Sequence, residues 1–449
     1  MPFFRLIVFL IIAARSALAV SQQCGASPRQ VRAGYWLSSS GRYSPVSTID
    51  VSLYTHIYYF SLSVDPLDST ISISQPDELP LLAVFSATLK KDSSSVKTLL
   101  SIATDAHRIE ESNAAFSAMA ADPIRRAAFI ESTMEIAREH SFDGLDLSWQ
   151  YPSSPADMAN LQLLLAEWRA RVGNETVETE REPESPLLLT ATVYFSGHLF
   201  GGSDDNVDYP IDAISRNLDW INVLCFGYQK NSKVAAADAA LFAKTSHSST
   251  SYGIGSWLDS GVASCKMVMG IPLYGRSWYL KNKEKTEPGA AVVAEGPRQR
   301  SSNQSGVMAY FEVEETLRDN GSTLVYDKET VFAYLHHGDL WVSFDNPEAV
   351  EEKINFARHK DLLGYFLFPI SFDDSNHTIS QHAFDAWSSY GADGGSNGDQ
   401  EVSSRGTSHG DQDARQAAEI SGSITWFPNL NANVLFSFLL LIFLVFIHG

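Results

Sequence analysis

Three polar side chains stand at alternate positions of one short apolar segment, and their types and spacing could do chemistry. In FDGLDLSWQYP, residues 142–152, these side chains are Asp146, Ser148 and Gln150. Successive side chains of a β-strand point to opposite faces, so the three polar groups share one face. A carboxylic acid at the end of such a face could transfer a proton to a substrate. The last group here is an amide, which donates hydrogen bonds but does not titrate near neutral pH.

Short apolar segments alternate with helical stretches along most of the chain, which predicts strands separated by helices. Two helices have clear signals. Asp122 and Pro123 begin one of them, and the second has an apolar face from Leu161 to Val172 and is expected to end at Gly173. The eight expected strands cover residues 31–36, 55–62, 96–102, 142–149, 187–195, 218–226, 266–274 and 362–368.

This alternation predicts a parallel sheet, and eight strand–helix units close naturally into a (β/α)8 TIM barrel. In that fold the chemistry lies at the C-terminal ends of the strands, where Ser148 and Gln150 are expected. An open doubly wound sheet is the alternative, but no dinucleotide-binding fingerprint follows the first strand. Residues 277–346 are long for a loop and contain strand-like pieces, so we expect a small α+β insertion between strands seven and eight.

Composition restricts the classes of function. The chain has 449 residues and 44% hydrophobic composition, enough for one large core with a subdomain or for two domains. Its formal net charge of -20 argues against a nucleic-acid partner, which requires a basic surface. No Cys/His cluster has metal-ligand spacing and no glycine-rich phosphate loop is present, so we expect neither a metal nor a cofactor.

Both ends of the chain resemble targeting signals. Residues 1–19 contain an apolar stretch followed by small residues, which indicates a secretory signal peptide. Residues 391–423 are rich in Gly, Ser, Asp and Gln and predict a flexible acidic stalk. Residues 424–449 hold an apolar stretch that is short for a spanning helix, with small residues upstream at 421–423. We interpret this end as a glycosylphosphatidylinositol (GPI) signal, with a spanning membrane segment or a soluble form as alternatives.

Sequons and cysteines fit a secreted glycoprotein. Cys225 lies near the end of strand six whereas Cys265 just precedes strand seven, so we expect no bond between them and a buried thiol at Cys225. Cys24 is then the only intramolecular partner left for Cys265, and no disulfide framework is expected from three cysteines. The four N-glycosylation sequons are at Asn174, Asn303, Asn320 and Asn376.

Residues 142–152 resemble the strand-four signature of glycoside hydrolase family 18, the chitinases, whose usual form is DGxDxDWEYP. The resemblance continues through segments such as AGYW, KTLLSI and GIPLYGR, and plant class V chitinases are the most similar class. It implies a chitinase-like barrel over residues 28–390 with a sugar cleft at the C-terminal ends of the strands. The residues implied to contact a ligand are Tyr35, Phe60, Gln150, Phe226, Tyr274, Arg276 and Phe368.

The catalytic positions depart from the family pattern. Gln150 stands where the family has a proton-donating Glu, and Ser148 stands where it has an Asp that orients the substrate N-acetyl group. Only Asp143 and Asp146 match, and we expect Asp146 to be structural, held inside the barrel by hydrogen bonds. Loss of a general acid alone costs roughly 10²–10⁴-fold in rate. We therefore expect no catalytic residue and no hydrolysis.

Further departures surround the implied cleft. Phe226 and Gly227 replace the Tyr and Asp of the family's acetamide clamp, Phe368 replaces a Trp, and Ala103 and Thr104 replace a glycine pair. A relocated acid is the weaker alternative. Asp105, Asp373 and Asp374 follow strands three and eight, although charged loop residues are usually only solvated.

These features leave three readings of function. The first is a pseudoenzyme of the cell surface, on the outer leaflet of the plasma membrane or the cell wall, that binds N-acetylglucosamine-containing or related glycans. The second is a scaffold or hydrolase inhibitor that binds a protein partner on the same barrel. The third is a glycoside hydrolase of altered specificity. Gln150 and Ser148 could also be neutral fillers at a strand end, with no ligand.

The C-terminal segment yields a first prediction. If the mature protein is anchored by a lipid, phosphoinositide-specific phospholipase should release it from membranes into the soluble fraction. Retention in the pellet, under conditions that free a known GPI-anchored control, would contradict the lipid anchor and favour a spanning helix.

Overall fold

The structure, a computed structural model, describes residues 30–73, 78–93, 95–178, 185–200, 207–229, 233–244 and 246–389. The expected signal peptide, the stalk, the C-terminal anchor segment and Cys24 lie outside these residues. Among the described residues, no helix combines the length and apolarity needed to cross a membrane.

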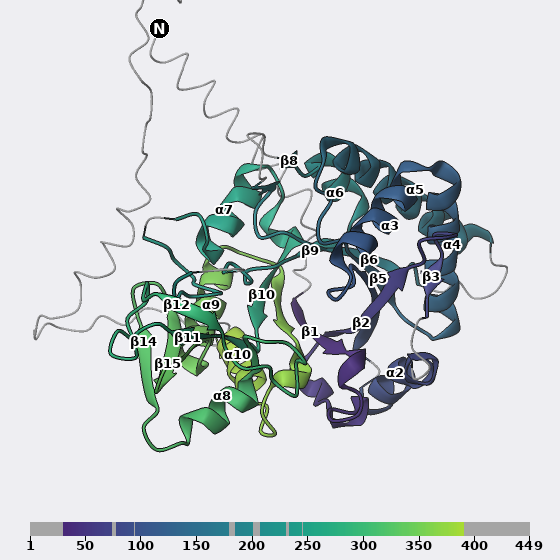
Figure 1. Cartoon of the computed structure of the whole chain (residues 1–449). Helices are drawn as coiled ribbons and strands as arrows, with labels where there is room; N and C mark the ends of the chain where they lie inside the picture. Colours follow the sequence, from purple (N-terminus) through teal and green to yellow (C-terminus); the bar gives the residue numbers. More distant parts are fainter. Residues whose placement is uncertain are drawn as a thin grey trace, which may run out of the picture. The chain divides into compact units, whose positions relative to one another are not determined.

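Eight parallel strands form a closed barrel, as predicted (Figure 1). Around the barrel the strands are β1 (Val31–Leu37), β17 (Gly364–Phe368), β10 (Met267–Pro272), β9 (Trp220–Val223), β6 (Leu188–Val193), β5 (Gly144–Ser148), β4 (Lys97–Ala103) and β2 (His56–Val64). Pairing of β1 with both β17 and β2 closes the ring and excludes the open doubly wound sheet.

Each of the eight strands overlaps one of the predicted segments, but β9 is shorter than the predicted strand 218–226. The chain leaves the sheet after Val223 because the backbone N–H of Cys225 turns back to the carbonyl of Val223. Gly227 then adopts a φ of +80°, which only glycine adopts without strain. Phe226 therefore belongs to the loop above the barrel and not to the strand.

Helices surround the barrel (Figure 1). They are α2 (Glu78–Asp92), α3 (Ile109–Ala121), α4 (Pro123–Glu139), α5 (Pro155–Glu178), α6 (Ile211–Asn217), α7 (Thr250–Asp259), α9 (Pro347–His359) and α10 (Thr378–Ser389). Short 3-10 helices are η1 (Ser38–Ser40), η2 (Val46–Thr48), η3 (Val51–Leu53), η4 (Ser264–Lys266) and η5 (Ile370–Phe372). Three two-residue strands are β3 (Ile71–Ser72), β7 (His198–Leu199) and β8 (Val207–Asp208).

The two helices with sequence signals differ in outcome. Helix α4 begins as predicted, since the Asp122 carboxylate accepts hydrogen bonds from the backbone N–H groups of Ile124 and Arg125. The prediction that the second helix ends at Gly173 is wrong, because α5 continues to Glu178. A glycine inside a helix costs only about 1 kcal/mol. The ion pair between Arg138 of α4 and Glu175, at 2.6 Å, stabilises the part of α5 that follows Gly173.

The expected α+β insertion lies between β10 and β17 and is seen at the lower left of Figure 1. A sheet core of tryptophan and other apolar residues holds it, with the rings of Trp278 and Trp341 5.7 Å apart. Its elements are β11 (Tyr274–Leu280), β12 (Val292–Glu295), β13 (Val307–Ala309), α8 (Tyr310–Leu317), β14 (Thr323–Asp327), β15 (Phe332–His337) and β16 (Leu340–Phe344). The main path of the sheet is β12-β11-β16-β15-β14, with β13 on β11.

Alternation along the barrel strands builds two cores. On β5, Leu145 and Leu147 pack outward in the large cluster shared with the helices. Asp146, between them, points inward and contacts Tyr35 of β1 across the barrel. The inward side also holds a separate cluster of apolar and aromatic residues that includes Tyr58 and Trp220. The polar side chains predicted to share one face of residues 142–152 therefore face the barrel interior.

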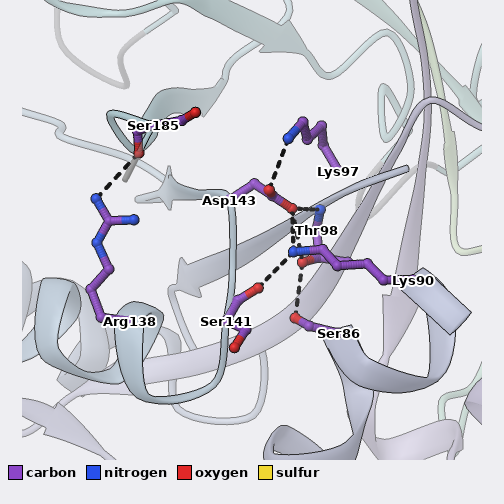
Figure 2. Close-up of polar contacts among 8 residues, drawn as sticks. All are labelled: Ser86, Lys90, Lys97, Thr98, Arg138, Ser141, Asp143 and Ser185. Atoms are coloured by element: carbon purple, nitrogen blue, oxygen red, sulfur yellow. Dashed lines mark hydrogen bonds and ion pairs between the residues drawn. The ribbon is translucent and has the colours of Figure 1, made fainter. Parts of the chain in front are cut away.

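Asp143 lies immediately before β5, close to Lys90, Lys97 and Thr98 (Figure 2), whereas Gln150 follows the other end of that strand. Its carboxylate forms ion pairs with Lys90 at 2.7 Å and Lys97 at 3.0 Å, and accepts the backbone N–H of Thr98 at 2.9 Å. Burial raises the pKa of this carboxyl, but these donors outweigh burial and hold the pKa below its usual range. Asp143 thus fastens α2 and β4 to β5 and takes no part in a site at the strands' C-terminal ends.

The two ends of the described barrel meet. The indole N–H of Trp387, in the last turn of α10, donates to the side-chain oxygen of Gln30 at 3.3 Å, just before β1. The ring of Trp387 also packs 5.5 Å from that of Tyr365, near the start of β17. The described chain therefore enters and leaves the barrel at the end where its strands begin.

The cysteines follow the strand geometry. Cys225 is free and buried, as predicted, and burial raises the pKa of its thiol to about 12. Cys265 lies in η4, before β10, and is disulfide-bonded. The absence of a Cys225–Cys265 bond is thus confirmed, while Cys24, the partner left open by the sequence, lies outside the described residues.

Asp143 yields the second prediction. Asp143→Asn should lower the free energy of unfolding by about 1–2 kcal/mol at neutral pH, because it removes a charged acceptor shared by two lysines. Since the folded pKa is depressed, this stabilisation is present above the unfolded pKa, about 4, and is lost as the pH falls through the folded pKa. Urea unfolding across that range should show the wild type converging on the variant.

Glu131→Gln is the matched control, because Glu131 pairs with Arg171 at 2.6 Å but is 57% exposed. Its effect should stay within about 0.5 kcal/mol. An equal effect of both substitutions, or a pH-independent effect of Asp143→Asn, would contradict the structural role of Asp143.

Candidate functional site

Inside the barrel, Asp146 is fully buried and surrounded by neutral donors. It accepts a hydrogen bond from the Tyr35 hydroxyl at 3.3 Å and from the Asn222 amide at 3.3 Å. Hydroxyl groups complete the set, from Ser101 at 2.8 Å, Thr190 at 2.8 Å and Thr192 at 3.0 Å. Burial raises the pKa of Asp146, and these hydrogen bonds oppose the rise. Asp146 thus lies inside the barrel and is held by hydrogen bonds from neighbouring strands, as expected.

Above Asp146, at the C-terminal end of β5, two neutral groups stand where the resemblance implied carboxylates. Ser148 is fully buried, and the side-chain amide of Gln150 donates to its hydroxyl at 3.3 Å. Gln150 itself is half-buried. The pair can donate and accept hydrogen bonds, but neither group can transfer a proton near neutral pH.

The backbone of Gln150 is clamped from both sides. Thr104, directly after β4, accepts the backbone N–H of Gln150 on its hydroxyl oxygen at 2.8 Å. Asn113 of α3 donates its side-chain amide to the carbonyl of Gln150 at 3.1 Å and accepts from the Thr104 hydroxyl at 3.1 Å. Thr104 stands where the resemblance implied a glycine, so the residue that departs from the pattern forms this clamp.

Aromatic rings from separate strands gather at the same end of the barrel. Phe368, at the end of β17, lies 5.3 Å from Phe60 of β2 in an edge-to-face contact and 5.7 Å from Phe226 in a stacked one. Phe226 in turn meets Tyr274 of β11 at 6.0 Å. All four rings are half-buried. Such rings, next to a few polar groups, form a surface suited to the apolar face of a sugar.

The position of Phe226 depends on the absence of a side chain at Gly270. A Cβ on Gly270 of β10 would lie 2.9 Å from a ring carbon of Phe226 and 2.5 Å from one of Phe366. Only glycine leaves room for both rings at this point. The ring of Phe226 therefore packs directly against the backbone of β10 at Gly270.

Tyr274 and Arg276 extend the site toward the insertion. Burial, followed by the charge of Asp238, raises the pKa of the Tyr274 hydroxyl. Asp238 is buried, and its carboxylate accepts the backbone N–H of Gln229 at 2.9 Å. Arg276 forms an ion pair with Glu295 of β12 at 2.8 Å. The guanidinium of Arg276 therefore already binds a carboxylate of the insertion.

The structure does not bring together every residue expected from the sequence. Gln150, Phe60, Phe226, Phe368 and Tyr274 lie at the C-terminal end of the barrel as the resemblance implied.

Tyr35 does not fit this expectation. Its side chain is 1% exposed, its ring stacks 4.2 Å from that of Tyr58, and its hydroxyl is bonded to Asp146. Tyr35 therefore supports the site from below and is not a ligand contact.

The three carboxylates considered for relocated catalysis are engaged by their own loops. Asp105 accepts from the backbone of His107 and pairs with Arg108 at 3.1 Å, and burial is outweighed by these partners, which lower its pKa. Asp373 and Asp374 accept hydrogen bonds at the start of α10. The lowered pKa of Asp105 disfavours it as a general acid. Burial raises the pKa of Asp373, but its carboxylate is occupied by the backbone N–H and the hydroxyl of Ser380.

Sequence reasoning missed Asn222, Asn113 and Asp238. Asn222 alternates with apolar residues in LDWINV, so the two-residue period of a strand could have placed it inside the barrel. Asn113 on a helix and Asp238 in a loop carry no such signal. Among the described residues, no group of three or more His, Cys, Asp or Glu could hold a metal ion.

Comparisons with known proteins agree with the fold. The model of Glycosyl hydrolases family 18 matches residues 31–373. Nod factor hydrolase protein 1 of Medicago truncatula is 36% identical over 365 residues, which cover 80% of this chain and 91% of the relative. The chain therefore belongs to glycosyl hydrolase family 18, and its relatives include plant class V chitinases.

Two solved structures bear on the site. A class V chitinase from Nicotiana tobaccum, carrying a glutamate-to-glutamine exchange and in complex with NAG4, is 33% identical with a TM-score of 0.73, covering 80% of this chain and 99% of that one. The chitinase-like agglutinin RobpsCRA from Robinia pseudoacacia is 32% identical with a TM-score of 0.69, covering 79% and 99%.

The interior network yields the third prediction. Tyr35→Phe should lower the free energy of unfolding by about 1–3 kcal/mol, because it removes one of the buried hydrogen-bond partners of Asp146 and of Asn222. Tyr43→Phe, at a tyrosine that is 46% exposed, should change it by less than about 0.5 kcal/mol. Chemical denaturation measures both. Equal stability of Tyr35→Phe and the wild type would show that the network does not need this hydroxyl.

Proposed function

We propose that this chain is an inactive chitinase-like protein that binds N-acetylglucosamine-containing or related glycans at the C-terminal end of its barrel. The carrying observation is the neutral pair at the end of β5, in which the Gln150 amide donates to the buried Ser148 hydroxyl. This pair occupies the positions from which family members deliver a proton and orient the substrate. A neutral pair retains hydrogen-bonding capacity and loses acid catalysis.

The surroundings support binding without hydrolysis. Phe226 and Gly227 offer neither a hydroxyl nor a carboxylate to polarise an acetamide, which substrate-assisted hydrolysis by this family requires. The rings of Phe60, Phe226 and Phe368 remain as an aromatic surface.

Relatives support the same proposal. The Nicotiana enzyme holds NAG4 while carrying a glutamate-to-glutamine exchange, and RobpsCRA is named an agglutinin. Sugar binding by a family member is therefore compatible with the loss of one glutamate.

We also propose that the protein acts outside the cell, as a glycoprotein of the cell surface held by a lipid anchor. The four sequon residues, Asn174, Asn303, Asn320 and Asn376, are all exposed, as glycan acceptors must be. The disulfide at Cys265 fits an oxidising compartment.

The fourth prediction concerns Gln150→Glu. The wild type should bind chito-oligosaccharides in a calorimetric titration without cleaving them, and Gln150→Glu should bind and still not cleave them. The substitution restores an acid but leaves Ser148, Phe226 and Gly227 unable to orient the acetamide. Turnover, measured by chromatography of the products, should stay at least about 10²-fold below that of an active class V chitinase.

Other outcomes favour the other readings. Turnover by the wild type would establish a hydrolase of altered specificity, and turnover by Gln150→Glu alone would show that only the proton donor was missing. A folded protein that binds no oligosaccharide on a glycan array would overturn the proposal in favour of a protein-binding scaffold.

A further inference from the structure

The sheet of the insertion has two edge strands, and they differ in how their outer sides are covered. A neighbouring segment lies along β12, where Val234 forms an antiparallel bridge with Ala291. The backbone N–H of Val292 also donates to the carbonyl of Lys233 at 3.1 Å. At the other edge, at the lower left of Figure 1, β14 pairs with β15 and with no further strand of the described chain. The outer backbone groups of β14 are therefore open to pairing with another strand.

The side chains of β14 do little to prevent such pairing. Edge strands of soluble proteins are usually protected by lysine, proline, a bulge or an inward-pointing charge. Residues 323–326 contain no charge and no proline, and their register with β15 is uninterrupted. Leu324 is 48% exposed. A short segment with high β-propensity and without charge or proline is the kind that associates with a second strand.

A glycosylation sequon stands directly before this strand. Its asparagine, Asn320, is exposed in the turn between α8 and β14. Ser322 donates its backbone N–H to the carbonyl of Asp319 at 3.2 Å and its hydroxyl to the carbonyl of Thr316 at 2.6 Å. These bonds join the turn to the end of α8. A group attached to Asn320 is therefore held three residues from Thr323, where β14 begins.

The same turn is also bonded to β15. The hydroxyl of Ser322 and Nδ1 of His337 lie 3.1 Å apart and share a hydrogen bond. Between Asn320 and Ser322, Gly321 adopts a φ of +102°, which a residue with a side chain adopts only with strain. Because the turn is bonded to both α8 and β15, the folded chain fixes the position of Asn320 relative to the open edge of β14.

We propose that an N-linked glycan on Asn320 covers the open edge of β14 and prevents this edge from pairing with β14 of a second copy of the chain. An N-linked glycan is bulky and hydrated. Attached beside the first residue of β14, it occupies space that a second strand would need at about 4.8 Å from β14. The glycan thus replaces the protective side chains that the strand lacks. This inference rests on the proposed glycoprotein and gives one of its glycans a function.

The fifth prediction compares the full chain, produced in a eukaryotic secretory system, with its Asn320→Gln variant. Mass spectrometry of glycopeptides should find a glycan on Asn320 of the wild type, and sedimentation velocity should show a monomer. Asn320→Gln should lower the dissociation constant of a dimer at least about 10-fold, because an antiparallel pair of β14 strands adds several backbone hydrogen bonds. The measurement is made in about 0.15 M salt, where repulsion between these acidic chains is screened.

Enzymatic removal of the glycans from the folded wild type should produce the same dimer. This second measurement decides the question even if Asn320→Gln impairs folding, which thermal unfolding detects.

Two further variants identify the contact. Asn320→Gln combined with Leu324→Lys should be a monomer again, because a lysine on an edge strand opposes pairing. Asn376→Gln is the matched control, since it removes an exposed sequon just before α10, outside the insertion. It should remain a monomer.

The outcomes separate this inference from the proposal on which it rests. A monomeric Asn320→Gln variant, or a wild type without a glycan on Asn320, would overturn the inference, while glycans on other sequons would leave the proposed glycoprotein standing. Association of Asn376→Gln, or of the double variant, would also overturn it, because the edge of β14 would not be the contact. If no sequon carries a glycan, the proposed glycoprotein and the inference fail together.

Discussion

The barrel depends on the buried carboxylate of Asp146, whose hydrogen bonds all come from uncharged donors. Asp146 receives hydrogen bonds from side chains on β1, β4, β6 and β9, and thus connects five of the eight strands through a single group. A buried charge without such partners would be prohibitively costly, whereas a fully satisfied network fixes one arrangement of its members. Tyr35 and Asn222 each bond to Asp146 and to one another. The aromatic rings and the neutral pair at the end of β5 are supported from below by this network.

Much of the fold follows from sequence periodicity. The alternation of short apolar segments with helical stretches, one of them capped by Asp122, is sufficient to predict the barrel, since burial and local hydrogen bonds act in the same direction there. The end of α5 was missed because Gly173 is a helix breaker only by local propensity. Six buried side chains on the helix face and the Arg138–Glu175 pair outweigh that preference. The length of β9 was missed for a related reason, as the apolar character of residues 224–226 continues after the backbone has turned away.

The sequence predicts which residues lie in the candidate site, but not which other residues bond to them. Alternation along residues 142–152 places Ser148 and Gln150 on the inward face. By contrast, no periodicity connects Thr104 with Asn113, or Asp238 with Tyr274, because loops bring these residues together. Tyr35 illustrates the opposite error, since an aromatic residue at an inward position can be a ligand contact or part of the core. Only its 1% exposure and its bonded hydroxyl distinguish the two roles. The hydrogen-bonded network around Asp146 thus lies inside the barrel, and the candidate site lies above it at the C-terminal ends of the strands.

The hydrogen bond between Trp387 and Gln30 has a consequence for how the molecule is presented to its surroundings. Both ends of the described domain leave from the base of the barrel, whereas Gln150 and the aromatic rings occupy its rim. Any group attached to either end would join the barrel at the end where its strands begin. The end of the barrel that carries Gln150 and the aromatic rings would then lie opposite the point of attachment.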